Sequence, residues 1–369
     1  MKVAIVHDWL NGMRGGEKVL EAILELYPTA DVYTLFYDRE KISYEIRSRN
    51  IFPSLLQKIP FGRSKYRNFL PLMPFLISRF DMSKYDLIIS SSHCVAKGVE
   101  KRPDALHVSY VHAPMRYMWD RYEDYFGKGR AGLLTRMIAR IVRSPLRAWD
   151  KKVSQKKRVD LLIANSQFIA DQLKKNYGRN AEVVHPFVDL ERFQLARDPK
   201  NYFLVFGAFA PYKRVDIAIQ ACLKARVPLV IAGSGQELEK LKTLVPANNP
   251  SITWKESPTN HEVQQLYSEC RALLFPGVED FGITPLEAMA SGAPVIAYGV
   301  GGATETVNAD TGVFFSEQSV ESLREAILDF EMRESKFSPA KLRARAEHFS
   351  KDRFKTEFKA AVNLVQFSK

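Results

Sequence analysis

Short apolar runs alternate with longer amphipathic stretches along most of this chain. In the first half, the runs predict buried strands, and stretches with apolar residues at helical spacing predict helices between several of them. The expected strands are 2–6, 32–36, 86–90, 107–111, 161–164 and 182–185, and the expected helices include 17–26, 131–157 and 166–176. Strands that alternate with helices in this way favour a mostly parallel sheet with helices on both faces.

A second series of the same kind follows a polar, proline-bounded stretch at 186–201, which we interpret as a linker. Its expected strands are 202–206, 229–232, 252–254, 272–275 and 294–297, and its expected helices are 215–224, 236–244, 261–270, 284–290, 320–331, 339–348 and 352–367. The pattern predicts an α/β chain of two Rossmann-like, doubly wound domains. Two such domains facing each other would leave a cleft at the carboxyl ends of their strands, where ligands of these folds bind.

The composition is that of a globular protein, with 46% hydrophobic and 26% charged residues, which excludes an extended disordered chain. Only four apolar residues, 3–6, precede His7, too few for the apolar core of a secretory signal. The most apolar stretch, 69–77, contains two prolines and falls short of the roughly 20 residues that cross a bilayer. We therefore expect a cytoplasmic protein whose three cysteines are reduced core thiols.

The segment from Glu279 to Glu287, EDFGITPLE, follows an expected strand and opens a helix. Backbone N–H groups at a helix N-terminus are free, and the helix dipole favours anions there. We predict that amides in this turn hold phosphate or sugar oxygens, namely those around Phe281, Gly282, Ile283 and Thr284. Glu287, about one turn into the helix, can accept hydrogen bonds from a ribose diol. The alternative is that both carboxylates merely favour the N-terminal dipole.

Two further junctions between a strand and a helix carry candidate residues. Gly207 opens the first, which ends in Lys213 and Arg214, two cations suited to the growing charge of a diphosphate leaving group. Cations at a helix N-terminus are electrostatically unfavourable without an anion, which argues against a merely solvated helix start. The second junction contains Gly233 and Ser234, and a lone Gly-x-Gly of this kind is weak evidence.

In the first half, Gly15 and Gly16 open a helix and could approach a phosphate or an acceptor, although a simple tight turn explains them equally well. His112 ends an expected strand, in a loop rich in large and charged side chains, where functional residues often lie. No Asp-x-Asp pair, which commonly holds a divalent metal on a diphosphate, occurs in the sequence. We therefore expect no metal cofactor, with Lys213, Arg214 and helix N-termini supplying the positive charge.

Together these segments resemble the family 4 retaining glycosyltransferases, which have the GT-B fold. EDFGITPLEAMASGAPVIAYGVGGATETV (279–307) resembles the family's glutamate motif region, and PYKRVD (211–216) resembles its diphosphate-binding segment. YVHAPMRYMWD (110–120) resembles bacterial mannosyltransferases that build O-antigen, capsule and exopolysaccharide chains. The resemblance implies an acceptor-binding domain at 1–190, a nucleotide-sugar-binding domain at 200–349, and a last helix, about 350–369, that crosses back to the first domain.

The resemblance also implies residue roles and a reaction. Glu287 would bind the ribose, Glu279 and His112 the donor sugar near the reacting centre, and Lys213 and Arg214 the diphosphate. Transfer with retention would proceed by front-face attack, and GDP-mannose is the expected donor. Family members commonly have Arg where this chain has Ala208, a difference that bears on the phosphate geometry and on donor choice.

The net charge of +12 lies wholly in residues 1–190, which hold 32 basic and 20 acidic residues. This asymmetry predicts an anionic partner for the first half. In the helix expected at 131–157, arginines and apolar residues form neighbouring faces, with Arg136, Arg140, Arg143 and Arg147 on the basic one. Such a helix suits an anionic membrane surface, although a helix packed on its own sheet with a solvated basic face fits equally. Basic and apolar residues also mix at 55–80, which favours a peripheral protein that reaches a polyprenyl-diphosphate-linked saccharide at the inner face of the cell membrane.

Three alternatives remain open at this point. The donor could be a UDP- or ADP-sugar, or the enzyme could be a nucleotide-sugar epimerase or hydrolase of the same fold. A nucleic-acid-binding protein would also fit the pI of about 9.4, but the sequence contains no known binding module, so we expect no nucleic-acid partner.

Overall fold

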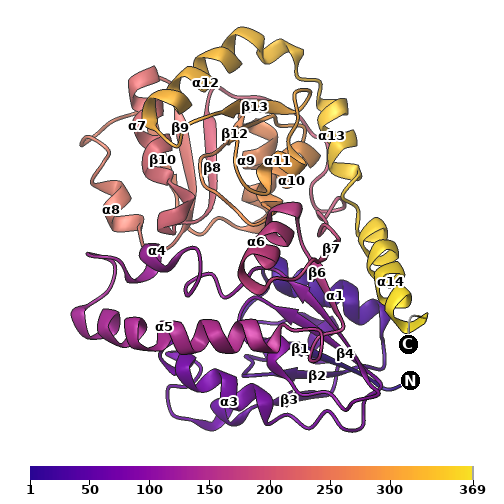
Figure 1. Ribbon diagram of the computed structural model, residues 1–369. Coiled ribbons are helices and arrows are strands. Elements are labelled where there is room, and N and C mark those ends of the chain that lie inside the picture. Colours follow the sequence, from indigo (N-terminus) through magenta and orange to yellow (C-terminus); the bar gives the residue numbers. More distant parts are fainter. Residues whose placement is uncertain (368–369) are drawn as a thin grey trace. The chain divides into compact units, whose positions relative to one another are not determined.

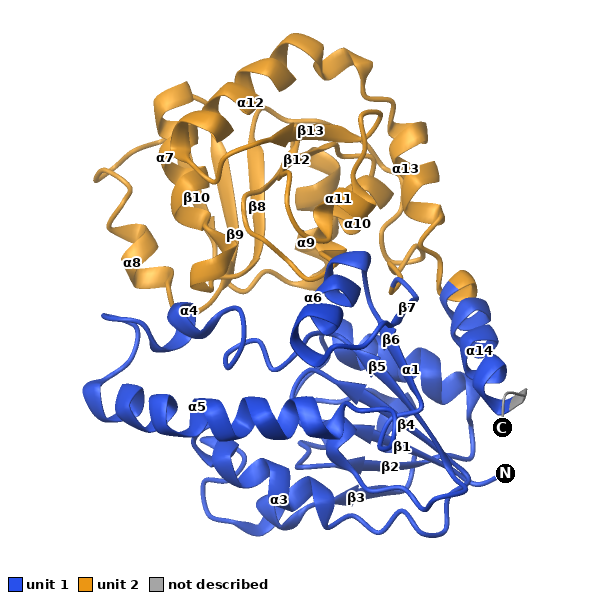
Figure 2. Cartoon of the chain, viewed as in Figure 1, with its two compact units in different colours: residues 1–185, 354–369 blue, residues 186–353 orange. Residues whose placement is uncertain are grey.

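The computed structural model describes residues 1–367, which form two compact units (Figure 2). Unit 1 comprises Met1–His185 together with the chain from Phe354 onward, and unit 2 comprises Pro186–Arg353. The stretch at 186–201, expected to be a linker, thus belongs to unit 2. Val188 shows why, because it is buried in a core cluster of unit 2 and its N–H donates to the carbonyl oxygen of Phe349 at 3.0 Å.

Unit 1 contains a seven-stranded parallel sheet in the order β3-β2-β1-β4-β5-β6-β7 (Figure 1). Its strands are β1 (Val3–His7), β2 (Asp31–Thr34), β3 (Ile51–Pro53), β4 (Leu87–Ser92), β5 (Leu106–Val111), β6 (Leu161–Ala164) and β7 (Glu182–Val183). The central strands β1 and β4 are buried along their whole length, as expected for a sheet covered on both faces, although β4 ends in three serines. The edge strand β3 was not expected, because its three residues carry too short an apolar signal.

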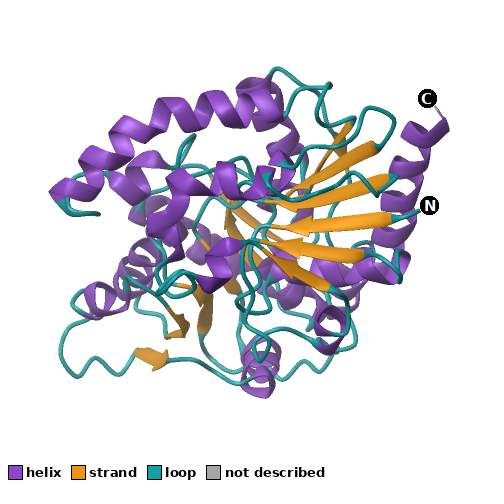
Figure 3. Ribbon diagram, turned by 90° about the horizontal axis from the view of Figure 1, so that it is seen from below, coloured by secondary structure: helices purple, strands orange, loops and turns teal. Residues whose placement is uncertain are grey.

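Helices flank the parallel strands (Figure 3). Those of unit 1 are α1 (Gly15–Leu26), α2 (Tyr44–Arg47), α3 (Met73–Ser78), α4 (Tyr122–Phe126), α5 (Leu133–Val153) and α6 (Gln167–Tyr177), with the 3₁₀ turns η1 (Leu55–Lys58), η2 (Tyr66–Leu72) and η3 (Ala96–Gly98). The last helix, α14 (Lys351–Phe367), lies mostly in unit 1, where Phe354 and Phe358 contact the ring of Tyr110. Within residues 1–367, no helix has both the length and the apolar character that crossing a bilayer requires.

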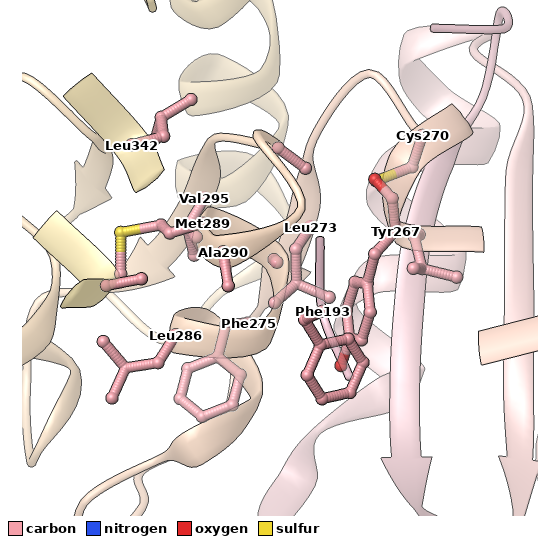
Figure 4. Close-up of a cluster of buried hydrophobic side chains, with 14 of the residues drawn as sticks. Phe193, Tyr267, Cys270, Leu273, Phe275, Leu286, Met289, Ala290, Val295 and Leu342 are labelled. Carbon is pink, nitrogen blue, oxygen red and sulfur yellow. The ribbon is translucent and has the colours of Figure 1, made fainter. Parts of the chain in front are cut away.

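Unit 2 contains a six-stranded parallel sheet in the order β10-β9-β8-β11-β12-β13. Its strands are β8 (Phe203–Ala208), β9 (Leu229–Ser234), β10 (Ile252–Lys255), β11 (Leu273–Phe275), β12 (Val295–Tyr298) and β13 (Gly312–Phe315), the last of which was not expected. Its helices are α7 (Val215–Ala225), α8 (Leu238–Lys242), α9 (Asn260–Glu269), α10 (Ile283–Ala290), α11 (Ala303–Thr306), α12 (Val320–Arg333) and α13 (Pro339–Glu347), with the 3₁₀ turns η4 (Pro211–Lys213) and η5 (Glu334–Lys336). Figure 4 shows one of its core clusters, in which Leu286 and Met289 of α10 lie with Phe275 of β11.

A buried polar network holds α5 in unit 1. The Asp150 carboxylate of α5 forms an ion pair with Lys97 at 2.6 Å, and both side chains are fully buried. The same carboxylate accepts hydrogen bonds from Trp119 Nε1 at 2.8 Å and from the Tyr177 hydroxyl at 2.6 Å. Burying two charges is costly in itself, so the value of this network depends on all its partners being present.

Replacing Asp150 with Asn should therefore destabilise unit 1 by about 3 kcal/mol, because it leaves the Lys97 ammonium buried without a countercharge. Urea unfolding followed by circular dichroism measures the loss. Asp171→Asn on the exposed face of α6 is the matched control and should change stability little. Equal stabilities of the Asp150 and Asp171 variants would show that the ion pair contributes nothing.

Candidate functional site

In unit 2, the carboxyl ends of β8 and β11 enclose a small hollow. It is lined by the end of β8 with Phe209, by Lys213, and by the end of β11 with Pro276 and Gly277. Gly207 and Ala208 both form part of this wall. Ligands of open parallel sheets bind at this end of the strands, so the hollow lies where the chemistry of such a fold is expected.

The loop after β11 packs directly on the backbone of Lys213. A Cβ atom at Gly277 would lie 2.8 Å from the Cα of Lys213 and 2.7 Å from the carbonyl oxygen of Tyr212, closer than a side chain allows. Glycine is therefore required for this approach. The contact brings the loop that carries Glu279 next to Lys213.

Lys213 and Glu279 form an ion pair. Their side chains are only 18% and 16% exposed, so most of the pair is shielded from water. The Glu279 loop is held from its other side by Gly302, whose N–H donates to the Glu279 carbonyl oxygen at 2.9 Å. A Cβ at Gly302 would lie 2.2 Å from the Cα of Phe281, which again leaves room for glycine alone. Two residues predicted separately for diphosphate and donor sugar are thus in direct contact.

Helix α10 presents an uncapped N-terminus in the same loop. Gly282 is its N-cap residue at φ 83°, and no side chain caps the first turn, which begins with Ile283 and Thr284. One turn on, the Glu287 carboxylate accepts a hydrogen bond from the Tyr267 hydroxyl at 2.9 Å. Burial raises the pKa of Glu287, and the hydrogen bond from Tyr267 opposes that rise. Sequence patterns had not pointed to Tyr267, which lies on α9.

Arg214, Gly233 and Ser234 have structural contacts of their own. The Arg214 guanidinium forms an ion pair with Asp216 at 3.0 Å and donates to the Gln318 side chain at 3.4 Å. A Cβ at Gly233 would lie 2.0 Å from the carbonyl oxygen of Gly207, so this glycine permits β8 and β9 to pair at their ends. Ser234 is exposed at the end of β9. The predicted roles of these residues toward a nucleotide stay predictions.

In unit 1, Gly16 lies close to a pair of histidines. A Cβ at Gly16 would lie 3.7 Å from the His112 ring and 3.8 Å from the His7 ring, an ordinary contact distance. Ser91 joins the two rings, with its hydroxyl 2.8 Å from His112 Nε2 and 3.1 Å from His7 Nδ1. Gly15 is the first residue of α1, beside Gly16. The structure thus places His112 beside the glycine pair. The sequence had pointed to each of them separately and had not predicted that they are neighbours.

Burial determines the charge of these histidines. It lowers the pKa of His7 to about 4, and it lowers the pKa of His112 well below its usual range, with the other histidines adding to the effect. A third histidine, His93, pairs with the buried Asp8 at 3.1 Å. The Asp8 carboxylate also accepts hydrogen bonds from the backbone N–H groups of residues 93–96 at 2.6–3.0 Å. These hydrogen bonds compensate for the loss of water around the buried carboxylate.

Two sequence profiles of glycosyltransferases match successive parts of the chain. The profile described as Glycosyltransferase Family 4 matches residues 15–192, and the profile described as Glycosyl transferases group 1 matches residues 188–351. Together the two profiles cover residues 15–351, so the chain is similar to glycosyltransferases over most of its length.

Curated relatives match the chain over part of their length. The D-inositol 3-phosphate glycosyltransferase of Streptomyces bingchenggensis is 35% identical over 175 residues, 39% of this chain and 38% of that protein. O-antigen chain mannosyltransferase C of Escherichia coli is 29% identical over 168 residues, 41% of this chain and 45% of that protein. The chain thus spans less than half the length of these relatives.

A solved structure matches the chain over nearly its whole length. The crystal structure of Anabaena HepE in complex with UDP and glucose has a TM-score of 0.72 at 16% identity, covering 98% of this chain and 99% of that one. Two parallel-sheet α/β units and this likeness show the GT-B fold.

The four arginines of α5 do not share one environment. Arg140 is exposed and Arg136 half-buried. The Arg143 guanidinium instead lies 4.0 Å from the centre of the Tyr122 ring, and that of Arg147 lies 4.1 Å from the centre of the Trp119 ring. Arg143 also donates to the carbonyl oxygen of Met118. Arg143 and Arg147 thus pack on their own unit, since cations favour aromatic ring faces.

The low pKa values predict that His7 and His112 stay neutral at pH 7. Because burial disfavours the imidazolium, His7 should take up a proton only near pH 4. A histidine NMR titration, assigned with His7→Gln and His112→Gln, measures this. His261→Gln, at an exposed position of unit 2, is the matched control for the assignment. A His7 midpoint near 6.5 would contradict the prediction.

Proposed function

We propose that this chain is a retaining glycosyltransferase that transfers mannose from GDP-mannose to a polyprenyl-diphosphate-linked saccharide. The observation that carries the proposal is the Lys213–Glu279 ion pair, whose lysine lines the hollow at the ends of β8 and β11. A lysine in this place suits a diphosphate, and the neighbouring carboxylate suits sugar hydroxyls. The relative from Escherichia coli, an O-antigen chain mannosyltransferase, supports the choice of mannose.

In the proposed donor site, each part of the nucleotide sugar contacts a different segment of unit 2. The diphosphate lies against Lys213 and the N-terminus of α10, which together supply the positive charge that a divalent metal would otherwise provide. Glu287, oriented by the Tyr267 hydroxyl, accepts hydrogen bonds from the ribose diol. Glu279 then exchanges its contact with Lys213 for hydroxyl groups of the donor sugar.

In the proposed reaction, the acceptor hydroxyl attacks the anomeric carbon from the side on which the nucleotide leaves. The bond between that carbon and the phosphate oxygen breaks, and the departing oxygen takes the proton of the hydroxyl. Lys213 stabilises the negative charge that develops on the diphosphate, which is the main electrostatic contribution. His112, neutral at pH 7, is assigned to the donor sugar as a hydrogen-bonding group. This account needs no side-chain nucleophile.

A UDP-sugar is the second candidate donor. The structure of Anabaena HepE holds UDP and glucose, and its chain is similar to this one over almost the whole length. The relative from Streptomyces is a D-inositol 3-phosphate glycosyltransferase, a protein with a different substrate from that of the O-antigen enzyme.

GDP should raise the melting temperature of the protein by several degrees at 100 times its Kd, because a ligand bound only by the folded state stabilises it by about 2.7 kcal/mol there. Lys213→Ala and Glu287→Ala should remove most of this increase. Lys255→Ala, which changes an exposed lysine of the same unit, should leave it intact. Stabilisation by UDP in place of GDP would contradict the proposed donor, and loss of the increase in all three variants would contradict the proposed site.

We further propose that α5 docks the enzyme on an anionic membrane. Five apolar side chains near its N-terminus are 47–72% exposed, namely Leu133, Leu134, Met137, Ile138 and Ile141. Arg136 and Arg140 lie among them in the chain. Exposed aliphatic residues beside arginines are typical of helices that lie in a lipid interface. The lipid-linked acceptor of the proposed reaction would be found at the same surface.

Replacing Leu134 and Ile141 together with Glu should reduce binding to phosphatidylglycerol vesicles at low salt at least roughly ten-fold. The reason is that each buried aliphatic side chain contributes about 1.5–3 kcal/mol. Co-sedimentation measures the bound fraction. Met332→Glu is the matched control, because Met332 is 80% exposed on α12 of unit 2. Membrane docking by α5 is refuted if the wild-type protein stays in the supernatant or if the control loses as much binding.

A further inference from the structure

Unit 1 contains a cavity of about 660 Å³, larger than the hollow beside Lys213 and within the usual range of small-molecule sites. It lies at the ends of β1 and β2, where Leu10 pairs with Tyr37 and the Asp38 N–H donates to the Leu10 carbonyl oxygen at 2.8 Å. These contacts place Asn11, which follows β1, and Asp38, which follows β2, in one wall. The carboxyl ends of parallel strands are again the expected place for a ligand.

The opposite wall comes from residues 57–66, which are held in place by side-chain contacts. Gln57 forms two hydrogen bonds with the backbone of Tyr37, accepting at 2.9 Å and donating at 3.2 Å. Tyr66 packs its ring against Phe36 and Trp9, with ring centres 5.2 and 4.8 Å apart. The walls of the cavity are therefore preformed.

The charges of the cavity are unbalanced. Lys41, Lys58 and Arg63 line it, against the single carboxylate of Asp38. Lys41 pairs with Asp38 at 3.2 Å. Among the described residues, no carboxylate lies within ion-pair distance of Lys58 or Arg63. The charge of Arg63 also acts on Asp38, without an ion pair between them, so Lys58 and in part Arg63 are available to an anionic ligand. Phosphate is an anion that both side chains bind well.

Two other features indicate that the ligand carries a sugar as well as a phosphate. Asn11 Oδ1 is buried and has no hydrogen-bond donor among the described residues, so a hydroxyl group would satisfy it. Phe61 lines the cavity with 71% of its surface exposed and holds a left-handed backbone at φ 60°, which is unfavourable for a bulky residue. An exposed aromatic ring offers an apolar surface to the face of a pyranose.

We propose that this cavity binds a phosphorylated sugar, with Lys58 and Arg63 on the phosphate and Asn11 on a sugar hydroxyl. The inference rests on the proposed function, in which the acceptor carries a sugar joined to a diphosphate. It assigns the first sugar and its phosphate to unit 1. The same phosphate chemistry occurs in phospholipid headgroups, but the buried acceptor of Asn11 and the ring of Phe61 favour the sugar.

Titration with glucose 1-phosphate, followed by ligand-observed NMR, tests the site. Arg63→Ala and Lys58→Ala should each weaken binding roughly ten-fold, the usual effect of losing one charge-assisted hydrogen bond. Arg39→Ala is the matched control, because Arg39 is exposed in the neighbouring loop but does not line the cavity. Asn11→Ala should weaken binding of glucose 1-phosphate while leaving binding of inorganic phosphate unchanged.

Three results would overturn the proposal. The control could weaken binding as much as Arg63→Ala, which would indicate general attraction to a basic surface. Lys213→Ala could abolish binding while Arg63→Ala leaves it intact, which would place the sugar phosphate in unit 2. Arg63→Ala and Lys58→Ala could lose binding to phosphatidylglycerol vesicles but not to glucose 1-phosphate, which would assign the cations to lipid headgroups.

The outcome is separable from that of the proposed function. Nucleotide stabilisation depends on Lys213 and Glu287 in unit 2, and we expect Arg63→Ala to retain it. A protein that binds glucose 1-phosphate through Arg63 but is stabilised by no nucleotide would support the cavity and refute the donor site. A protein stabilised by GDP whose cavity variants bind glucose 1-phosphate normally would support the donor site and refute the cavity.

Discussion

Close backbone packing at the strand ends of unit 2 is the constraint on which the candidate donor site depends. The loop after β11 approaches Lys213 at Gly277, and the turn after β12 approaches Phe281 at Gly302. At either position any side chain would separate the two backbones. Because glycine allows both close backbone contacts, the Glu279 loop is held between them. Glu279 therefore forms a largely shielded ion pair with Lys213. The geometry of the candidate site thus depends on glycine at positions 277 and 302.

Shielding from water gives the two units different electrostatic characters. In unit 2 it strengthens the attraction between Lys213 and Glu279, which backbone packing has placed together, and it raises the pKa of Glu287. In unit 1 it keeps His7 and His112 neutral, so the excess positive charge of this unit lies in its lysines and arginines. Those cations are not equivalent, since Arg147 packs on Trp119, whereas Arg63 lines a cavity and has no carboxylate within ion-pair distance among the described residues. Net charge alone would not have distinguished them.

Much of the fold could be predicted from the sequence, because its central strands are continuous apolar runs and its helices have regular apolar spacing. Strands β3 and β13 were missed, since three or four residues at a sheet edge leave little pattern. Lys213 and Glu279 were identified by their place after strands, but their pairing depends on tertiary packing. The contact of Tyr267 with Glu287 joins two different helices, and the cavity lined by Asn11 is formed by several segments of the chain. Neither leaves a signal in the local sequence.

The central claim is that a nucleotide sugar binds at the strand ends of unit 2, on Lys213, Glu279 and the N-terminus of α10. Hydrogen–deuterium exchange with and without GDP-mannose tests this directly, because bound oxygen atoms protect the amides that they contact. The account predicts new protection in residues 207–213 and 277–287, and its loss in Lys213→Ala. Protection confined to residues outside these two segments, or unchanged in the Lys213 variant, would contradict it.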